Sequence, residues 1–326
     1  MTAEKSLIVE HENNVAAVDQ CDVVIVNFNA GRFFAEAVKS VLHSQSVAHI
    51  YVLDNASTDG SLSLLPLGKD VRLTIIRNSV NVGFAAACNG GLSQATSENV
   101  LLLNPDCQVM DGAIDRLITV LRSTDRVGMT GPLLLNPDGS EQAGGRRRLP
   151  TPWIVLVQTV RAARLGRFFF PHAPSFLLHE DPLPKEPTEV EAISGACMMV
   201  RREMILDIGP LDEEYFLHAE DLDWCMRAHR QGWKILFVPD AKAIHHKGVS
   251  SRGRPLAVEY YKHRGMMRFY GKMIGENQSR WSSGLLTAGV WTRFGLIAAL
   301  QLLSRGAKQL RRIFRLGPNG EKAGHG

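Results

Sequence analysis

Short apolar runs, mostly of β-branched residues, recur through the first third of the chain. They are Asp22–Phe28, Ile50–Leu53, Leu73–Ile76 and Val100–Leu103. Uninterrupted apolar runs of this length are typical of strands that are buried on both faces. We therefore predict four buried strands.

The segments between these runs carry apolar residues at helical spacing. They are Phe33–His43, Asn81–Leu92 and Ile114–Leu121. In the first of them Phe34, Val38 and Val41 fall on one helical face. Strands that alternate with helices predict an α/β fold, in which a mostly parallel sheet has helices on both faces. Ligands of such sheets bind at the carboxyl ends of the strands.

Polar residues follow all four predicted strands at that edge. They are Asn27-Phe28-Asn29, Asp54-Asn55, Arg77-Asn78 and Asn104-Pro105-Asp106. A single Asn or Asp is usually a cap or turn residue, but four polar strand ends along one edge favour a ligand site. The sequence has no G-x-G-x-x-G after the first strand and no G-K-[ST], so it predicts neither a dinucleotide site nor a P-loop.

A second folded section is predicted from Val190 to His246. It contains a strand-like stretch, Lys234–Val238, and an acidic helix start, Glu220–Trp224. Before it, Trp153–Phe170 mixes apolar residues with three arginines, which fits a mobile lid, a membrane-facing patch or a solvated helix that covers the core.

Composition and charge divide the chain into unequal parts. With 326 residues and 45% apolar content it can bury a full core, and its five separated cysteines favour a reducing compartment. Residues 1–20 lack the apolar run of a secretory signal, so we predict a disordered extension on a cytoplasmic protein. Residues 252–326 hold fourteen Lys/Arg against three Asp/Glu, whereas the rest of the chain is net acidic.

The basic tail predicts contact with an anionic surface. Leu285–Leu303 is largely apolar but contains Arg293, and a central charge costs about 2.5–3.5 kcal/mol in a membrane span. An amphipathic helix on the inner face of the cell membrane therefore fits better than a transmembrane helix. The alternative is a packed appendage or a homo-oligomer contact. The acidic body argues against nucleic acid as a partner.

Three polar elements could meet in one site: Asn104-Pro105-Asp106, Glu220-Asp221 and His245-His246. Carboxylate oxygens with one imidazole suit Mg²⁺ or Mn²⁺. Acids at a helix start are also common as capping residues, and a lone His is often structural. The combination favours a metal-assisted enzyme.

Seven segments resemble family 2 glycosyltransferases with the GT-A fold, and they are most similar to the rhamnosyltransferase-like branch. They are VVIVNFN (23–29), VLDNASTDGS (52–61), NVGFAAACNGG (81–91), LLLNPD (101–106), SGACMMVRR (194–202), AEDLDWCMR (219–227) and HHKGVS (245–250). The resemblance covers roughly residues 22–250, and the order and spacing of the segments make it specific.

The resemblance implies a divalent-metal site and a nucleotide-sugar pocket. Asp106 and His245 are the implied metal ligands, with His246 as the alternative. The implied nucleotide-sugar-binding residues are Asn27, Asn29, Asp54, Asn55, Asn78, Gly83 and Asn104. Asn104 stands where the family's commonest motif has an Asp, so one negative charge is lost near the diphosphate.

The resemblance also implies the reaction. Asp221 is the expected base for an inverting transfer from a dTDP- or UDP-sugar, with rhamnose favoured, to a glycan or polyprenyl-linked acceptor. The acceptor side is expected to comprise Gly195, Ala196, Glu220 and Trp224, with anchoring of the helix as the alternative role of Trp224.

The predicted organisation is a GT-A domain over 21–250, with a nucleotide-sugar half (21–130) and an acceptor half (131–250), followed by a basic helical tail over 251–326. A nucleotidyltransferase, which usually has a Gly-rich basic loop after its first strand, is the alternative enzyme. A non-catalytic module that binds carbohydrate or nucleic acid is the alternative from another class.

Overall fold

The computed structural model describes residues 20–65, 71–151, 154, 175–249, 255–274 and 280–315. Apart from Gln20 and Ile154, the predicted N-terminal extension and the arginine-bearing segment at 153–170 lie outside these residues.

The four predicted strands form one parallel half of a sheet. They are β1 (Cys21–Asn27), β2 (Val47–Asp54), β3 (Leu73–Arg77) and β4 (Asn99–Leu103), in the order β3-β2-β1-β4. All of them carry the apolar runs seen in the sequence, and β1 and β4 are buried along their whole length. The prediction of an α/β fold is confirmed.

The remaining strands extend this sheet to nine within the described part of the chain. They are β5 (Cys107–Val109), β6 (Val127–Leu135), β8 (Thr188–Glu189), β10 (Cys197–Arg201) and β11 (Lys234–His245). β10 runs antiparallel between β4 and β6, and β11 runs parallel to β6. Two short strands, β7 (Arg146–Arg147) and β9 (Ala192–Ile193), pair separately.

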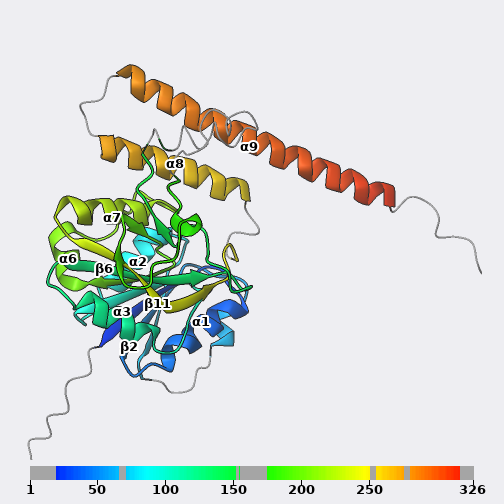
Figure 1. Cartoon of the computed structure of the whole chain (residues 1–326). Coiled ribbons are helices and arrows are strands. Elements are labelled where there is room, and N and C mark those ends of the chain that lie inside the picture. The colour runs from blue at the N-terminus through cyan, green and yellow to red at the C-terminus, as the bar shows by residue number, and fades with distance from the viewer. Residues whose placement is uncertain are drawn as a thin grey trace, which may run out of the picture.

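Helices cover both faces of the sheet (Figure 1). α1 (Arg32–Leu42) and α3 (Ala113–Leu121) pack on one face, and α2 (Phe84–Leu92), α6 (Arg202–Ile208) and α7 (Glu220–Arg230) pack on the other. Two short 3₁₀ helices span Ser61–Leu64 and Leu178–Glu180. The burial of Phe34, Val38 and Val41 confirms the predicted apolar face of α1.

α2 begins three residues later than the predicted Asn81. The Asn81 side chain accepts a hydrogen bond from the backbone N–H of Gly83 at 2.9 Å, and Gly83 has a φ of 92°. This left-handed conformation is easy for glycine and ends the loop before the helix.

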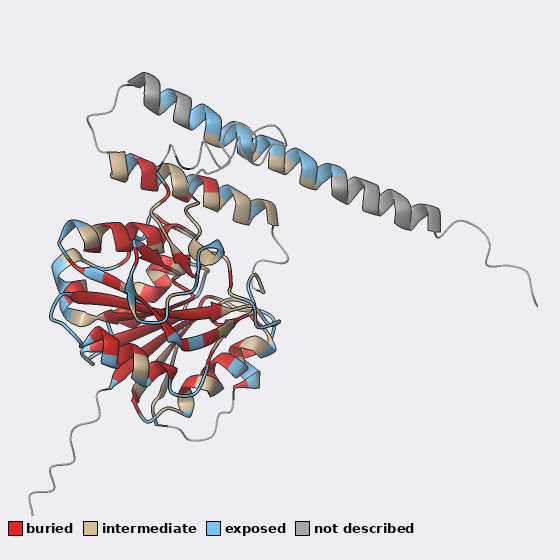
Figure 2. Cartoon of the chain, viewed as in Figure 1, coloured by how far each residue is buried: buried red, intermediate tan, exposed pale blue. Residues whose placement is uncertain are grey.

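Two C-terminal helices, α8 (Pro255–Ile274) and α9 (Arg280–Arg315), confirm the helical prediction for the tail. α8 packs on the body through the buried side chains of Phe269 and Tyr270, and Lys272 lies 2.9 Å from the fully buried Asp223 of α7. α8 therefore packs directly against the body of the protein. Figure 2 shows that the described side chains of α9 are mostly exposed.

No helix in the described ranges is both long enough and apolar enough to cross a bilayer.

Candidate active site

The ends of β1 and β2 meet at the floor of a polar site. Asn27 is directly opposite Asp54 in the parallel register, and its Nδ2 lies 2.9 Å from Asp54 Oδ1. Asn27 is fully buried and Asp54 is 4% exposed. The Oδ1 atom of Asn27 has no hydrogen-bond partner among the described residues, which leaves an acceptor beneath the site.

The loop after β2 is tied to the end of β1. Asn29 accepts a hydrogen bond from Thr58 N at 2.7 Å, and its own N–H donates to Ser57 Oγ at 3.1 Å. Ser57 and Ser61 also lie within 3.0 Å of Asn27 Nδ2. The sequence reasoning did not name these two serines, although they lie in the VLDNASTDGS segment.

Asn55 organises the loop that leads into α2. Its Nδ2 donates to Asn81 Oδ1 at 3.1 Å and to Gly83 O at 3.0 Å, and its Oδ1 accepts from Asn78 Nδ2 at 2.9 Å. Both ends of the amide are therefore engaged inside the protein. Asn55 and Asn78 therefore hold the shape of the loop that leads into α2.

His245, at the end of β11, faces Asp106 just beyond β4. His245 Nε2 lies 3.2 Å from Asp106 Oδ1 and 3.5 Å from Asn104 Nδ2. Asp106 also accepts a hydrogen bond from Val249 N at 3.3 Å. Burial acts to raise the pKa of Asp106, but the contacts with His245 and Val249 outweigh it, so the pKa is lowered.

Gln142 fixes the tautomer of His245. The Nε2 of Gln142 donates to the carbonyl of His245 at 2.9 Å and to Asn136 Oδ1 at 3.0 Å, so its Oε1 must be the acceptor that faces His245 Nδ1 at 2.7 Å. Nδ1 of His245 therefore carries a proton in either charge state. The facing Nε2 donates to Asp106 when the ring is doubly protonated, and it offers a lone pair, as a metal ligand must, when the ring is neutral.

This arrangement fits a divalent cation. A lone pair on His245 Nε2 and a carboxylate oxygen of Asp106 face each other at 3.2 Å, and two ligands at about 2.1 Å from a shared ion, at right angles, are separated by about 3 Å. No cluster of three or more His, Cys, Asp or Glu suited to a metal occurs among the residues described. His246, the alternative ligand, instead packs its ring on Phe33 at 4.5 Å.

The acidic pair at the start of α7 lies against β7 and β9. Asp221 Oδ2 accepts from Arg147 Nη2 at 2.6 Å and from Gly195 N at 3.1 Å, and Oδ1 accepts from Leu222 N at 2.8 Å. Burial acts to raise the pKa of Asp221, but the charge of Arg147 leads the effects that lower it, and the pKa falls below its usual range. Asp221 is therefore ionised at neutral pH.

The neighbouring Glu220 differs from Asp221 in its protonation state. It is 7% exposed, and its Oε2 has no hydrogen-bond partner within the described structure. Burial, followed by the neighbouring charge of Asp221, raises its pKa to about 8. At neutral pH Glu220 is mostly protonated, so the pair carries one negative charge.

Backbone hydrogen bonds connect the acidic pair Glu220–Asp221 to the Asp106–His245 pair. Asn104 N donates to the carbonyl of Ala196 at 2.9 Å, and the preceding residue, Gly195, donates to Asp221. A Cβ on Gly195 would lie 3.3 Å from the Cβ of Asp221, so the backbone and the helix start are in close contact. The chain thus brings Asp106, His245 and Asp221 to the same edge of the sheet.

Of the two roles expected for Trp224, the structure contradicts acceptor binding and agrees with anchoring of the helix. Its side chain is fully buried, and its indole N–H donates to the carbonyl of Gly209 at 2.9 Å. Trp224 therefore anchors α7 to the loop after α6. Arg147 and Gln142 were missed, although Arg147 belongs to the basic triplet 146–148.

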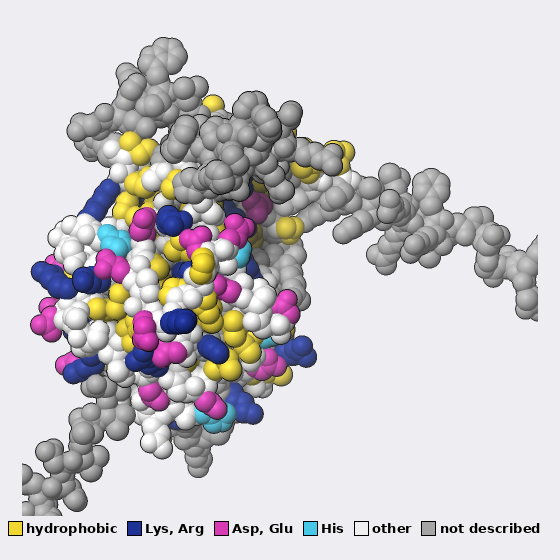
Figure 3. All heavy atoms as spheres, viewed as in Figure 1, with side chains coloured by type: hydrophobic (Ala, Val, Ile, Leu, Met, Phe, Trp, Pro, Cys, Tyr) yellow, Lys and Arg dark blue, Asp and Glu magenta, His cyan; other side chains and the backbone are white. Residues whose placement is uncertain are grey.

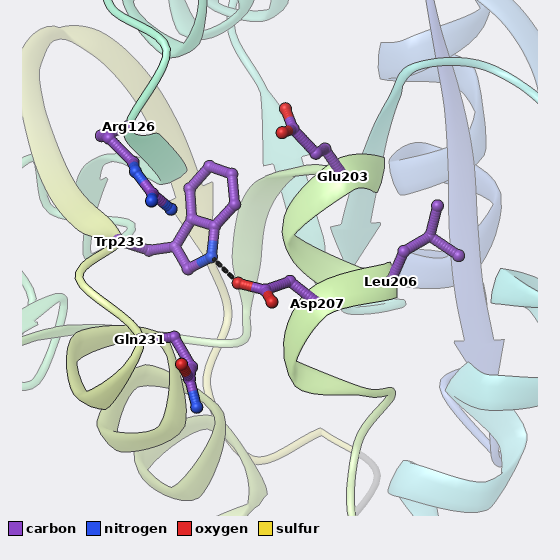
Figure 4. Close-up of a pocket in the computed structure, with 6 residues that line it drawn as sticks. All are labelled: Arg126, Glu203, Leu206, Asp207, Gln231 and Trp233. Carbon is purple, nitrogen blue, oxygen red and sulfur yellow. Dashed lines mark hydrogen bonds between the residues drawn. The ribbon is translucent and has the colours of Figure 1, made fainter.

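A surface pocket of about 480 Å³ lies at the opposite edge of the sheet (Figure 4). Arg126 and Trp233, which line it, directly precede β6 and β11, whereas the candidate site follows the ends of the strands. Within this pocket the indole of Trp233 donates to Asp207 at 2.7 Å. We do not assign the active site to this pocket.

Comparisons with known proteins agree with the geometry. The profile of Glycosyl transferase family 2 matches residues 22–209, more than half of the chain, and Glycosyl transferase family group 2 matches residues 154–311. N-acetylglucosaminyl-diphospho-decaprenol L-rhamnosyltransferase of Mycobacterium tuberculosis (strain ATCC 25618 / H37Rv) is 28% identical over 293 residues, which cover 86% of this chain and 91% of that protein.

Solved structures share the fold. The mannosyltransferase PcManGT from Pyrobaculum calidifontis, in complex with GDP-Man and Mn²⁺, matches with a TM-score of 0.52 and 17% identity over 89% of this chain and 80% of that one. GalNAc-T7 with UDP, GalNAc and Mn²⁺ matches with a TM-score of 0.51 and 20% identity over 71% of this chain, but only 44% of that one. The chain belongs to glycosyl transferase family 2: it is a glycosyltransferase that resembles the family's rhamnosyltransferases.

Proposed function

We propose that the protein is an inverting glycosyltransferase that moves a sugar from a nucleoside diphosphate to a hydroxyl of a lipid-linked acceptor. The observation that carries this proposal is the convergence of ionised Asp221 with the Asp106–His245 pair at one sheet edge. Family membership in the glycosyltransferases argues against the alternatives of a nucleotidyltransferase and a binding module.

The proposed donor and acceptor follow from the relative in M. tuberculosis, whose name gives L-rhamnose as the transferred sugar and a decaprenol diphosphate as the acceptor lipid. We propose rhamnose from dTDP- or UDP-rhamnose and a polyprenyl-linked glycan as the substrates. Asp54, on the floor of the pocket, can accept an N–H of a pyrimidine base.

Asp106 and His245 are the proposed ligands of Mg²⁺ or Mn²⁺, with the remaining positions taken by diphosphate oxygens of the donor. The cation would neutralise charge that develops on the leaving diphosphate. Gln142 orients His245 for this role, in the way that outer hydrogen bonds usually fix metal-binding histidines.

Asp221 is the proposed base. Its Oδ2 accepts two hydrogen bonds and its Oδ1 accepts one, so Oδ1 keeps a lone pair for the acceptor hydroxyl. As the acceptor oxygen bonds to the anomeric carbon, its proton passes to Oδ1 and the bond between that carbon and the diphosphate oxygen breaks. A single displacement of this kind inverts the anomeric configuration.

The proposed location is the inner face of the cell membrane, with the basic C-terminal region against anionic lipid. Residues 252–326 carry fourteen Lys/Arg, and each basic residue near such a surface contributes about 1 kcal/mol. Binding of the purified protein to anionic but not to neutral vesicles, lost at high salt, tests this location. A homo-oligomer formed by the same region is the alternative, and sedimentation distinguishes it.

The enzymatic proposal is tested by the variant Asp221→Asn with Mn²⁺ or Mg²⁺ and a panel of donors. Loss of a general base costs at least about a hundredfold in transfer rate, whereas donor binding should persist. Wild-type turnover in the variant would exclude Asp221 as the base. Asp207→Asn, at the opposite sheet edge, is the matched control and should transfer at the wild-type rate.

A further inference from the structure

Five aromatic side chains form a continuous row across three segments of the chain. The rings of Phe216 and Tyr261 stack with centroids 4.4 Å apart. Tyr260 then contacts Tyr261 at 5.5 Å and Trp291 at 5.8 Å, and Trp291 contacts Phe294 at 5.6 Å. We call these five residues the aromatic row.

The inner end of the row lies at the candidate active site. The carbonyl of Phe216 accepts a hydrogen bond from Phe84 N at 2.8 Å, and a Cβ on Gly83 would lie 2.8 Å from the same oxygen. Phe216 also precedes the acidic pair at Glu220 in the same loop. The row therefore begins between the loop that leads into α2 and the proposed base.

The outer end of the row reaches an apolar surface of α9. Leu296, Leu300 and Leu303 are 63%, 67% and 70% exposed, and their spacing places them on one helical face. Trp291 and Tyr260 are themselves 36% and 40% exposed. Figure 3 shows scattered hydrophobic side chains on the described surface in this view. No other described residue buries these leucines, so within the described part of the chain this surface is available to a partner.

We propose that the aromatic row and the leucine face of α9 bind the hydrocarbon chain of the lipid-linked acceptor, and so guide its sugar to Asp221. This inference rests on the proposed function. Two observations favour this occupant: the row is continuous with the site, and the basic C-terminal region complements the phosphates that join a polyprenyl chain to its sugar. Aromatic side chains also suit the boundary between hydrocarbon and headgroups.

The test compares two acceptors that share N-acetylglucosaminyl diphosphate but carry either a decaprenyl or a hexyl chain. In the double variant Tyr260→Ala/Trp291→Ala, kcat/KM for the decaprenyl acceptor should fall about tenfold or more, as expected from the loss of roughly 60 Å² of apolar contact. For the hexyl acceptor, kcat/KM should stay within about twofold of the wild-type value, because the short chain does not reach the outer end of the aromatic row. Retained hexyl activity also shows that the variant is folded.

Leu206→Ala is the matched control, because this leucine is 78% exposed on α6, away from the row. This variant should have the wild-type kcat/KM for both acceptors. An equal loss for both acceptors in the double variant, or no loss for either, would overturn the inference. A change in oligomeric state with an unchanged preference for the decaprenyl acceptor would also overturn it and assign the surface to a second copy. Wild-type failure on both acceptors would count against the proposed function itself.

Discussion

The guanidinium of Arg147 holds the carboxylate of Asp221, with Nη2 2.6 Å from Oδ2. The same Nη2 donates to the carbonyl of Ile193 at 2.8 Å, so Arg147 fixes Asp221 against β9. The side chains of Arg147 and Asp221 are 14% and 15% exposed, and water screens the pair little. Arg147 is therefore a positioning residue that keeps the proposed base ionised.

Arg147→Met should make the pKa of Asp221 rise, because burial is then no longer outweighed by the guanidinium. The acidic limb of the kcat/KM profile should move to higher pH, and Arg147→Lys should restore part of the shift. A pH profile that stays in place would contradict this role.

The Arg147→Met variant should also lose roughly 3–5 kcal/mol of unfolding free energy, as expected when one partner of a buried pair is removed. In the wild type the lowered pKa of Asp221 stabilises the fold above the carboxyl's unfolded pKa, and this stabilisation is lost as pH falls through the folded pKa. The difference in unfolding free energy between the wild type and the variant should therefore become smaller in acid. Urea unfolding at several pH values measures this difference.

Glu220→Gln should change the pH dependence of stability in the opposite sense. The folded pKa of Glu220 is about 8, against an ordinary value of 4.5, so the folded state holds its proton more tightly. Wild-type stability should fall as pH rises between these values, and the Gln variant should lack this slope. The exposed Glu214→Gln serves as the control. Parallel curves for wild type and Glu220→Gln would refute the assignment.

Gln142→Leu should weaken metal activation without removing a proposed ligand. Gln142 Oε1 holds the Nδ1 proton of His245, and loss of such an outer partner usually costs about 10–100-fold in metal affinity. The readout is the Mn²⁺ concentration for half-maximal binding, followed by calorimetry. The exposed Gln94→Leu should bind as the wild type does, and equal affinities for all three proteins would remove Gln142 from the site.

Gly265 and Gly271 of α8 offer a matched pair of substitutions. A Cβ on Gly265 would lie 2.6 Å from the carbonyl oxygen of His218, whereas a Cβ on Gly271 meets nothing within 4 Å. Gly265→Ala should destabilise the protein by roughly 1–3 kcal/mol. Gly271→Ala should stabilise it by about 0.5–1 kcal/mol. Thermal unfolding measures both, and similar shifts would show that α8 does not press on the loop before Glu220.

The residues at the carboxyl ends of the parallel strands could be predicted from the sequence, because each strand is marked by a local apolar run. A buried run such as Val100–Leu103 identifies a strand, and the polar residues that follow it must then lie at the edge where the parallel strands end. In this way Asn27, Asp54 and Asp106 could be placed before any coordinates were known.

The residues that tune the site could not be found in the same way. Gln142 and His245 are 103 positions apart, and Arg147 and Asp221 are 74 apart. No local pattern marks such partners, because the contact depends on how β7 and β11 are placed by the whole sheet. The sequence pattern also did not predict the full length of β11, because its pairing with β6 shifts register between Val238 and Lys242.

The position of β10 has a consequence for turnover. Residues 197–201 pair with β4 on one side, and β10 also pairs with β6 on the other, so one continuous backbone ladder joins the predicted nucleotide-sugar half (21–130) to the predicted acceptor half (131–250). The halves cannot swing apart like a clamshell without breaking those ladders. We therefore expect the proposed substrates to enter and leave without a hinge motion between these two parts of the chain.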